Sequence, residues 1–531
     1  MADVGERSWG GRRYRNLHGP HAITPFGSED GGVVRTRNEK RTSTGWLLGI
    51  LFAALAALGA PAPPDAAASR PVVAVSASVD TSHPGAVVPR DFLGLSFELS
   101  SLPLLASYAH EGDLVALLRS LGPGVLRFGG VSADTGVAWR DEPDPLPSWA
   151  SGQVRAADFR GLAVLAARTG WHVLLTIGLG HFEPAAAARE VVAAKAALGP
   201  WLEAIELGNE PNAYALHGLR SEPWTFVQYD EQLSAYRAAI EAAAPGVPLA
   251  GPDTSGSSAF ESWAPAEVID QRPAILTGHH YALGCAAQPP PSIERLLSHR
   301  TQQLEEASLP GYVDVARAFE TPLRLDEINN ISCGGVAGIS DAFASALWAV
   351  GYLTQAMAAG VAGVNLHGIP SNCAGYAPLC APTPQDLAAG VLYPQPEWYA
   401  LLLAKALIGE RPLPTITIPM PRVNLRLAAL LAGDGTLHVV IVDDDPPGAR
   451  SVLVRLRADR RFSGASVLAL TAPSPAALVG VHLAGHVVAP ERPWSPPAVL
   501  PRVPNEHGVI SVAINPSSAA LLTLTPRQRW H

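Results

Sequence analysis

Short apolar runs and longer amphipathic stretches alternate through the middle of the chain. The amphipathic stretches, such as "WTFVQYDEQLSAYRAAIEAAA", carry apolar residues at helical spacing, whereas the apolar runs end in polar residues or glycine. A strand followed by a helix eight times over predicts an α/β protein, a (β/α)8 TIM barrel of ~250 residues or more. A doubly wound sheet is the alternative, although about six strands would suffice for it. The runs predicted to be strands are residues 91–99, 125–130, 171–180, 201–210, 248–253, 274–281, 322–329 and 360–368.

The last part of the chain has a different pattern. From about Pro412 the helical spacing disappears, and alternating segments such as "GVISVAINPSSAALLTLTP" are separated by glycine, aspartate and proline. This pattern predicts an all-β sandwich over residues 412–531. Another strand-like segment, "RPVVAVSASVD", precedes the barrel. We therefore expect residues 70–90 to join the C-terminal module and residues 91–411 to form the barrel.

The N-terminal part has the layout of a signal peptide. Basic residues (Arg35, Arg37, Lys40 and Arg41) precede the apolar stretch "WLLGILFAALAALGA", and small residues and prolines follow it. The apolar stretch is short for a membrane-spanning helix of ~20 residues. We expect residues 1–69 to be a partly disordered leader and the mature chain to begin near Ala68, as in a secreted protein. An uncleaved membrane anchor is the alternative.

Composition limits the classes of partner. The chain is 48% hydrophobic and 16% charged, which is typical of a globular protein, and its net charge is −9. A net negative charge excludes a broad nucleic-acid-binding surface. The basic stretch "RLRADRR" (residues 455–461) fits a solvated strand edge better than a polyanion site.

The four cysteines of the chain all follow the leader. An even number of cysteines in an exported chain indicates disulfides. Cys373 and Cys380 lie in one loop, "SNCAGYAPLC", and we predict that they pair, which leaves Cys285 to pair with Cys333. Metal binding is the alternative, but no CxxC or HxxxH spacing supports it.

Two glutamates end predicted strands. Glu210, in "IELGNEPN", ends the fourth, and Glu327, in "LRLDEINN", ends the seventh. Burying an ionised carboxylate is costly unless it is paired or used, and Pro211 stops the strand because it lacks a backbone N–H. Reactive groups of a barrel lie at the C-terminal strand ends, so the two carboxylates can face each other, as glycoside hydrolysis requires. The alternative is that each glutamate only caps a strand in a salt bridge.

At this point the chain resembles glycoside hydrolase family 79, the β-glucuronidase and heparanase family, within the large clan of retaining barrel glycosidases. The resemblance implies a (β/α)8 barrel with a small β module and hydrolysis of a glucuronide. It covers about residues 92–406. The segments that carry it are "LGLSFEL", "VLRFGG", "ELGNEPN", "HHYALGC", "EINNISCGG", "GISDAFASALWAVGYL", "GVNLHG" and "YPQPEWYALLLAKAL".

The resemblance also implies catalytic roles. Glu210 would be the general acid/base and Glu327 the nucleophile, while Asn209 would bind the sugar 2-hydroxyl. Tyr281 would orient Glu327 through its hydroxyl, with core packing as its alternative. Arg127 would lie below Glu327 and keep it ionised, or form a structural ion pair with Asp326 instead.

An acid sugar also needs an anion site. The turn "SCGG" offers the backbone N–H groups of Gly334 and Gly335, and Tyr376 in the predicted disulfide loop offers a hydroxyl. The glycines could also simply form a turn. Three histidines are expected at the rim, either lining the sugar site or as neutral core residues, and no spacing predicts a metal or another cofactor. They are His279, His280 and His367.

These observations predict an exported retaining enzyme that removes terminal β-linked glucuronate from glycans or glucuronides. Only "SSLPLLASYAH" separates the first strand from its helix, so the insert excised from heparanase precursors does not fit there. The acidic balance also favours exo cleavage over endo cleavage of heparan sulfate. Other readings are a xylosidase or arabinofuranosidase of the same clan and a non-catalytic carbohydrate-binding surface protein. A membrane partner is expected only if the leader stays uncleaved.

Overall fold

A computed structural model describes residues 72–140, 145–417, 423–457 and 462–526. The chain divides into two compact units, Met1–Ala68 and Ser69–His531, and every element described here belongs to the second. The predicted leader and its cleavage site lie outside the described residues, as do residues 458–461 of the basic stretch. In the part of the chain that the structure describes, no helix has the length and apolar character needed to cross a bilayer.

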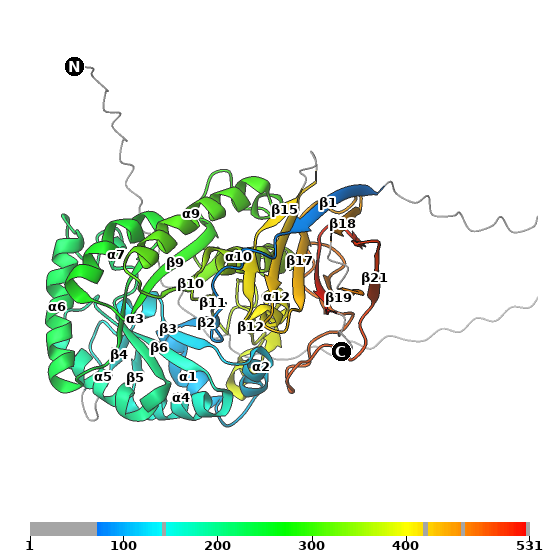
Figure 1. Cartoon of the computed structure of the whole chain (residues 1–531). Helices are drawn as coiled ribbons and strands as arrows, with labels where there is room; N and C mark the ends of the chain where they lie inside the picture. The colour runs from blue at the N-terminus through cyan, green and yellow to red at the C-terminus, as the bar shows by residue number, and fades with distance from the viewer. Residues whose placement is uncertain (1–71, 141–144, 418–422, 458–461, 527–531) are drawn as a thin grey trace, which may run out of the picture. The chain divides into compact units, whose positions relative to one another are not determined.

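A closed barrel of eight parallel strands forms the larger part of the second unit, as the sequence predicts (Figure 1). Each strand coincides with one of the eight predicted apolar runs, although the fifth, sixth and seventh strands extend two residues beyond their runs. Burial explains the apolar pattern, since every residue of the seventh strand is buried. The strands, in the order of the chain, are β2 (Leu93–Glu98), β3 (Val125–Gly129), β6 (His172–Ile177), β7 (Leu202–Leu207), β8 (Leu249–Ser255), β9 (Ile275–Leu283), β10 (Leu323–Ile331) and β11 (Gly363–Gly368).

Helices cover the outside of the barrel. Helix α10 is apolar almost all round because most of its residues are buried. The main helices are α1 (Leu102–Ser107), α2 (Leu114–Leu121), α4 (Ala156–Thr169), α5 (Pro184–Leu198), α6 (Phe226–Ala243), α7 (Ser257–Gln271), α9 (His299–Ala318), α10 (Phe343–Ala359) and α12 (Pro396–Ala404).

Short elements decorate the loops at the C-terminal ends of the strands. After β3 the chain forms α3 (Val131–Thr135) and then β4 (Val137–Trp139), which pairs in parallel with β5 (Gly152–Val154). After β7 a single 3-10 turn, η3 (Pro211–Ala213), begins directly after Glu210. After β11, β12 (Leu379–Cys380) pairs with β13 (Tyr393–Pro394). These loops carry Asn209, Glu210 and Tyr376, whereas the barrel strands carry most other residues of the candidate site.

The C-terminal module is one eleven-stranded sheet that folds over its own apolar core, and the N-terminal strand belongs to it, as predicted. Strand β1, blue in Figure 1, lies between β18, in parallel, and β15, in antiparallel register. The strands are β1 (Val73–Val79), β14 (Arg411–Leu413), β15 (Thr415–Thr417), β16 (Leu425–Leu431), β17 (Leu437–Asp443), β18 (Val452–Arg457), β19 (Gly464–Thr471), β20 (His482–Leu483), β21 (Arg502–Glu506), β22 (Val509–Ile514) and β23 (Ser518–Leu524).

The basic residues of β18 are solvated, but the strand is not at an edge. Arg455 and Arg457 are exposed, and their apolar neighbours on the strand are buried. Because β18 pairs with β1 on one side and β22 on the other, the prediction of a strand edge is wrong in that detail. The alternation places the arginines on the solvent face of an interior strand.

Candidate active site

Arg127 lies at the centre of the barrel mouth and is fully buried. Its Nη1 donates to Oε2 of Glu327 at 2.6 Å, and its Nη2 donates to Oδ1 of Asn209 and Oδ2 of Asp253, both at 2.9 Å. Its Nε lies 3.3 Å from Oδ2 of Asp326. Arg127 therefore contacts Glu327 and pairs with Asp326 at the same time, so the two predicted arrangements of Arg127 occur together.

Glu327 is the more deeply buried of the two strand-end glutamates, with its side chain 10% exposed. The hydroxyl of Tyr281 donates to its Oε1 at 2.8 Å, in the orienting position that the sequence predicts. Burial opposes ionisation, but the imidazoles of His367 and His279 and the guanidinium of Arg127 hold the pKa of Glu327 well below its usual range. Glu327 is therefore ionised at neutral pH, as a nucleophile must be.

Glu210 follows the end of β7 by three residues and lies on a strained backbone. Its φ is 48° and its ψ is 51°, a left-handed conformation that is uncommon for a residue with a side chain. Its N–H donates to the backbone oxygen of Asp253 at 2.9 Å, which fixes the turn. The side chain is 21% exposed. The turn thus presents a carboxyl group to the open side of the site, above the buried Glu327.

His279 connects Glu210 to a buried aspartate. Its Nδ1 lies 3.0 Å from Oε1 of Glu210, and its Nε2 lies 2.7 Å from Oδ1 of Asp253. Burial opposes the charged imidazolium, but Asp253 and Glu327 raise the pKa of His279 well above its usual value. The protonated ring donates from both nitrogens, so it holds Glu210 in place through a bond anchored at Asp253.

The carboxyl groups around Arg127 differ in how readily they ionise. Burial and the neighbouring Asp253 and Glu206 raise the pKa of Asp326 well above its usual range. Burial and, after it, the charge of Asp253 also raise the pKa of Glu206. The pKa values of Asp253 and Glu327 are lowered instead, and these two carboxylates lie against Arg127 and His279. Buried ions are tolerated when they are paired and hydrogen-bonded in this way.

Two sets of side chains have the spacing of a metal site. They are Glu210, His279 and Glu327, and Asp253, His279 and Asp326, and the ligand atoms of each set lie within 4.8 Å of one another. In both sets the nitrogens of His279 are already bonded to carboxylates, and the guanidinium of Arg127 contacts Glu327, Asp253 and Asp326. A positive charge of the protein thus occupies the place that a cation would take.

Two hydroxyls and one backbone N–H, called the donor cluster below, meet beside Glu327 on the side of the predicted anion site. The hydroxyl of Tyr376 lies 3.3 Å from the hydroxyl of Tyr281, and the N–H of Gly334 donates to the hydroxyl of Tyr376 at 3.2 Å. Gly334 has a φ of 84°, which favours glycine at this turn. Gly335 differs from the prediction, because its N–H donates within the turn to the oxygen of Ser332 at 3.3 Å. Since Tyr281 donates to Glu327 and Gly334 donates to Tyr376, the O–H of Tyr376 is the donor of the cluster that can turn to a ligand.

Both predicted disulfides are confirmed, and they brace this donor cluster. Cys373 pairs with Cys380, with their Cα atoms 5.3 Å apart, and closes the loop that carries Tyr376. Cys285 pairs with Cys333, with Cα atoms 6.0 Å apart, and ties the end of β9 to the turn that carries Gly334. Covalent closure of both loops limits the conformations open to the donors.

Of the three histidines expected at the rim, two lie in the site and one does not. The Nδ1 of His367 lies 3.0 Å from the Oγ of Ser96 and 3.7 Å from Oε2 of Glu327. His280 instead stacks on Tyr352 outside the barrel, at 4.6 Å between ring centroids, so its prediction as a rim residue is wrong. Side chains alternate along β9, and a histidine between two inward residues must point outward.

Several residues of the site were not predicted as such. Glu98 ends β2, its Oε2 accepts the N–H of Ser132 at 2.8 Å, and its Oε1 lies 3.9 Å from Nε2 of His367. Asp253 lies two residues before the end of β8 and is the last residue of the predicted run 248–253. Both are acids at or near strand ends, the same signal that indicated Glu210 and Glu327. Asp134 accepts the N–H of Asn209 at 2.9 Å from the loop after β3, and only its fold position could have indicated that contact.

Neither protein-family models nor the sequences of curated proteins match the chain. Solved structures do. A 4-O-α-L-rhamnosyl-β-D-glucuronidase from Fusarium oxysporum, in complex with Rha-GlcA, matches with a TM-score of 0.68 and 18% identity, covering 85% of this chain and 100% of that one. The arabinofuranosidase of glycoside hydrolase family 51 from Xanthomonas axonopodis matches with a TM-score of 0.62 and 14% identity, covering 85% and 100%.

A monomeric β-xylosidase from Caulobacter crescentus is also similar, with a TM-score of 0.54 and 15% identity over 86% of this chain and 100% of that one. At these identities the likeness concerns the fold. The chain therefore shares its architecture, a (β/α)8 barrel joined to a β module, with barrel glycosidases of several substrate specificities.

Proposed function

We propose that the chain is a retaining β-glycosidase in which Glu210 is the general acid/base and Glu327 the nucleophile. The observation that carries the proposal is the pairing of these groups at the barrel mouth. One oxygen of each, together with a nitrogen of His279, lies within 4.8 Å of the others. Retaining enzymes hold their two carboxyl groups ~5–5.5 Å apart, whereas inverting enzymes need ~6.5–9.5 Å to fit a water molecule.

The environments of the two carboxyl groups suit these two roles. Glu327, kept ionised by Arg127, His279 and His367, attacks the anomeric carbon to form a glycosyl-enzyme ester. Glu210 gives its proton to the departing oxygen and then takes a proton from the water that cleaves the ester. Because Arg127 holds Oδ1 of Asn209, the amide nitrogen of Asn209 is the group turned to the sugar 2-hydroxyl.

We propose terminal β-linked glucuronate as the substrate. A glucuronide differs from a glucoside in carrying a carboxylate at C6, and the enzyme must replace the hydration of that carboxylate with fixed donors. The hydroxyl of Tyr376 lies beside the nucleophile, and its O–H is the one left to bond the carboxylate, because Tyr281 donates to Glu327 and Gly334 donates to Tyr376. The similarity to a 4-O-α-L-rhamnosyl-β-D-glucuronidase structure supports a glucuronide as the substrate, and the net charge of −9 favours exo cleavage over binding along a polyanion.

A second candidate is an arabinofuranosidase or β-xylosidase, because solved structures of both kinds share the fold. A panel of aryl glycosides (β-glucuronide, β-glucoside, β-xyloside and α-L-arabinofuranoside) separates the candidates. The proposal expects the highest kcat/KM for the glucuronide. Faster hydrolysis of the xyloside or the arabinofuranoside would show that the donor cluster does not select substrates with a carboxylate.

We also propose that the protein is exported after removal of the N-terminal segment. The two disulfides support this, because such bonds persist mainly in oxidising compartments. N-terminal sequencing of protein from the exported fraction tests it, with a first residue near position 69 expected. A mature chain that retains residues 46–60 would indicate an anchor instead.

A further inference from the structure

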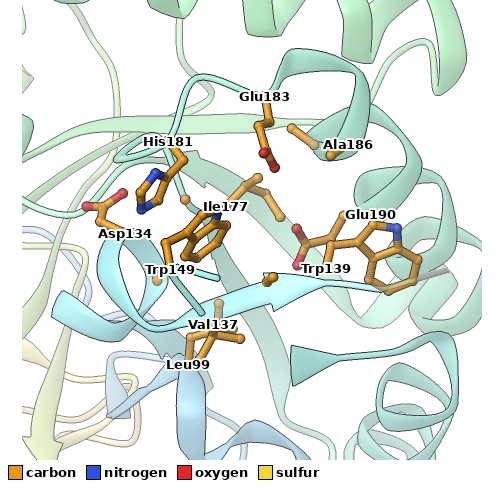
Figure 2. A pocket seen from close by; sticks show the side chains of 14 residues that line it. Leu99, Asp134, Val137, Trp139, Trp149, Ile177, His181, Glu183, Ala186 and Glu190 are labelled. Atoms are coloured by element: carbon orange, nitrogen blue, oxygen red, sulfur yellow. The ribbon is translucent and has the colours of Figure 1, made fainter. Parts of the chain in front are cut away.

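A cavity lies between the β4 segment, the end of β6 and the first turns of α5 (Figure 2). Its volume is ≈ 40 Å³. Its polar and aromatic lining is Asp134, Trp139, Trp149, His181, Glu183 and Glu190. That volume holds about three water-sized groups, which is room for a hydroxymethyl group but not for a sugar ring. The proposed chemistry makes no use of this cavity.

Glu190 is an unpartnered acid on α5. It is 5% exposed, and no hydrogen-bond partner for its Oε1 is found among the described residues. Figure 2 shows its carboxyl group pointing into the space between Trp139 and Trp149. Burial raises the pKa of Glu190 to about 8, so the group is neutral at neutral pH and has both an O–H to donate and an oxygen to accept. Buried groups of this kind call for a partner, and a hydroxyl group supplies both halves.

Trp149 and His181 form an aromatic pair at the half-buried rim of the cavity. Their ring centroids are 4.0 Å apart and their planes are 17° from parallel. Burial lowers the pKa of His181, which keeps the ring neutral. The uncharged imidazole thus packs against one face of the indole. An indole held in this way provides a flat apolar surface for the C–H face of a sugar ring.

The cavity adjoins the acid/base side of the catalytic pair. Asp134, in its lining, accepts the N–H groups of Leu179 and Gly180 through one oxygen and that of Asn209 through the other. Asn209 immediately precedes Glu210, which acts on the departing oxygen in the proposed mechanism. A glycan with its terminal sugar at Glu327 would therefore extend past Glu210, on its leaving-group side, toward this cavity.

The lining selects the charge of the ligand. Glu183 and Asp134 add two more carboxyl groups, and within the part of the chain that the structure describes no lysine or arginine lines the cavity. A uronate or sulfated sugar would meet carboxyl groups and no compensating cation in this lining, which is unfavourable in a partly desolvated site. A neutral sugar would meet no such repulsion.

We infer that this cavity is a subsite for a neutral sugar on the leaving-group side of the scissile bond. The ring of that sugar stacks on Trp149, and one hydroxyl or hydroxymethyl group enters the cavity and bonds to Glu190. The inference rests on the proposed function and adds the class of aglycone: a glycan whose terminal glucuronate is carried by neutral sugars.

The test compares a short and a long substrate on the full-length enzyme. The short one is an aryl β-glucuronide, and the long one is the β-glucuronide of a neutral galacto-trisaccharide. Each variant is scored by the kcat/KM of the long substrate divided by that of the short one. The variants are Trp149→Ala, Trp149→Phe, Glu190→Ala and Glu190→Gln, with Tyr393→Ala as a control at an exposed aromatic residue of β13.

We expect Trp149→Ala and Glu190→Ala to lower the ratio about tenfold, mainly through KM of the long substrate, which corresponds to ~1.4 kcal/mol. Trp149→Phe and Glu190→Gln retain a stacking face and a neutral hydrogen-bonding group, so they should restore most of the ratio. Equal loss on both substrates, or an unchanged ratio in the two alanine variants, would overturn the inference.

The aryl glycoside panel keeps this result separate from the proposed function. If the wild type prefers another sugar, the substrate proposal fails, and the same ratio is measured with trisaccharides that end in the preferred sugar. If the wild type cleaves no glycoside, calorimetric titration with the neutral trisaccharide tests the subsite. The subsite is supported if the wild type binds the trisaccharide and Trp149→Ala does not. It is contradicted if the wild type does not bind the trisaccharide.

Discussion

Arg127 and His279 define the chemistry of the site at the scale of single residues. Arg127 contacts the proposed nucleophile Glu327 directly, and His279 holds the proposed acid/base Glu210 through a bond anchored at Asp253. The pKa values of Asp326 and Glu206 are raised, so these two groups add less negative charge around Arg127. Pairing with Arg127 and His279 offsets the desolvation cost of keeping Glu327 ionised.

The role of Glu210 predicts a dependence on the leaving group. Glu210→Gln should lower kcat/KM by about 10²–10⁴-fold for alkyl glucuronides, whose leaving oxygen needs a proton. Hydrolysis of dinitrophenyl glucuronides should lose much less in the glycosylation step, because that leaving group departs as an anion. Pre-steady-state kinetics on both substrates measure the difference. Glu203→Gln, near the other end of β7, is the control, and equal losses for both substrates would remove Glu210 from the acid role.

Tyr376 predicts a dependence on the sugar carboxylate. Tyr376→Phe removes one donor of the cluster, and a hydrogen bond to a charged partner contributes ~1.5–3 kcal/mol. We expect kcat/KM for an aryl glucuronide to fall about ten- to hundredfold, with any residual glucoside activity nearly unchanged. Tyr393→Phe, at an exposed position on β13, should change neither. If Tyr376→Phe lowers both activities by the same factor, Tyr376 does not recognise the sugar carboxylate.

At the scale of elements, the disulfides and a buried acid hold the loop that carries Tyr376. Asn329 on β10 donates to the backbone oxygens of His367 and Tyr376 at 2.8 and 2.9 Å. Glu397 of α12 accepts from Asn330 at 2.7 Å and from Asn329 at 3.3 Å. Burial raises the pKa of Glu397 well above its usual value, so this network is neutral. The loop is therefore fixed both to the barrel and to itself.

This arrangement predicts that the Cys373–Cys380 bond supports selectivity. Replacing both cysteines by serine should lower the preference for glucuronide over glucoside, because Tyr376 loses its fixed position, and should cost about 2–4 kcal/mol of unfolding free energy. A double-mutant cycle with Tyr376→Phe checks the link. If the loop acts through Tyr376, the combined loss of selectivity is smaller than the sum of the two separate losses. Additive losses would show that the bond acts elsewhere.

The barrel could be predicted from the sequence because each strand is an apolar run that ends at a polar rim, as "VLRFGG" and "LRLDEINN" do. The pairing of Glu210 with Glu327 could be predicted because the strand ends of a barrel meet at one face. His280 was misplaced because the prediction ignored the alternation of side chains along β9. Gly335 was misplaced because the partner of a turn N–H depends on loop geometry. The cavity at Glu190 joins a helix, a short β extension and a loop, and no periodic pattern indicates such a junction.

At the scale of the whole molecule, buried carboxyl groups outside the site make stability depend on pH. Glu267 of α7 is 3% exposed, and the hydroxyl of Tyr229 donates to its Oε2 at 3.3 Å. Burial raises its pKa to about 8, above the value of an unfolded chain. The stability linked to this group is therefore complete below the unfolded pKa and is lost as pH rises toward 8.

Glu267→Gln tests this linkage, because glutamine does not ionise. Between about pH 5 and pH 8 the wild type should lose roughly 1.4 kcal/mol of unfolding free energy per pH unit from this residue, and the variant should lack that loss. Denaturant unfolding at several pH values measures both slopes. Glu261→Gln, at an exposed position of the same helix, should leave the slope unchanged. Identical slopes for wild type and Glu267→Gln would contradict the assignment.

The stereochemistry of the product tests the central claim most directly. If Glu327 attacks the anomeric carbon and water then displaces it, hydrolysis inverts the anomeric centre twice. Proton NMR during cleavage of an aryl β-glucuronide should then show β-glucuronic acid as the first product, with the α-anomer appearing only later through mutarotation. If α-glucuronic acid appears first, the reaction is a single displacement, and Glu210 and Glu327 do not form a retaining pair.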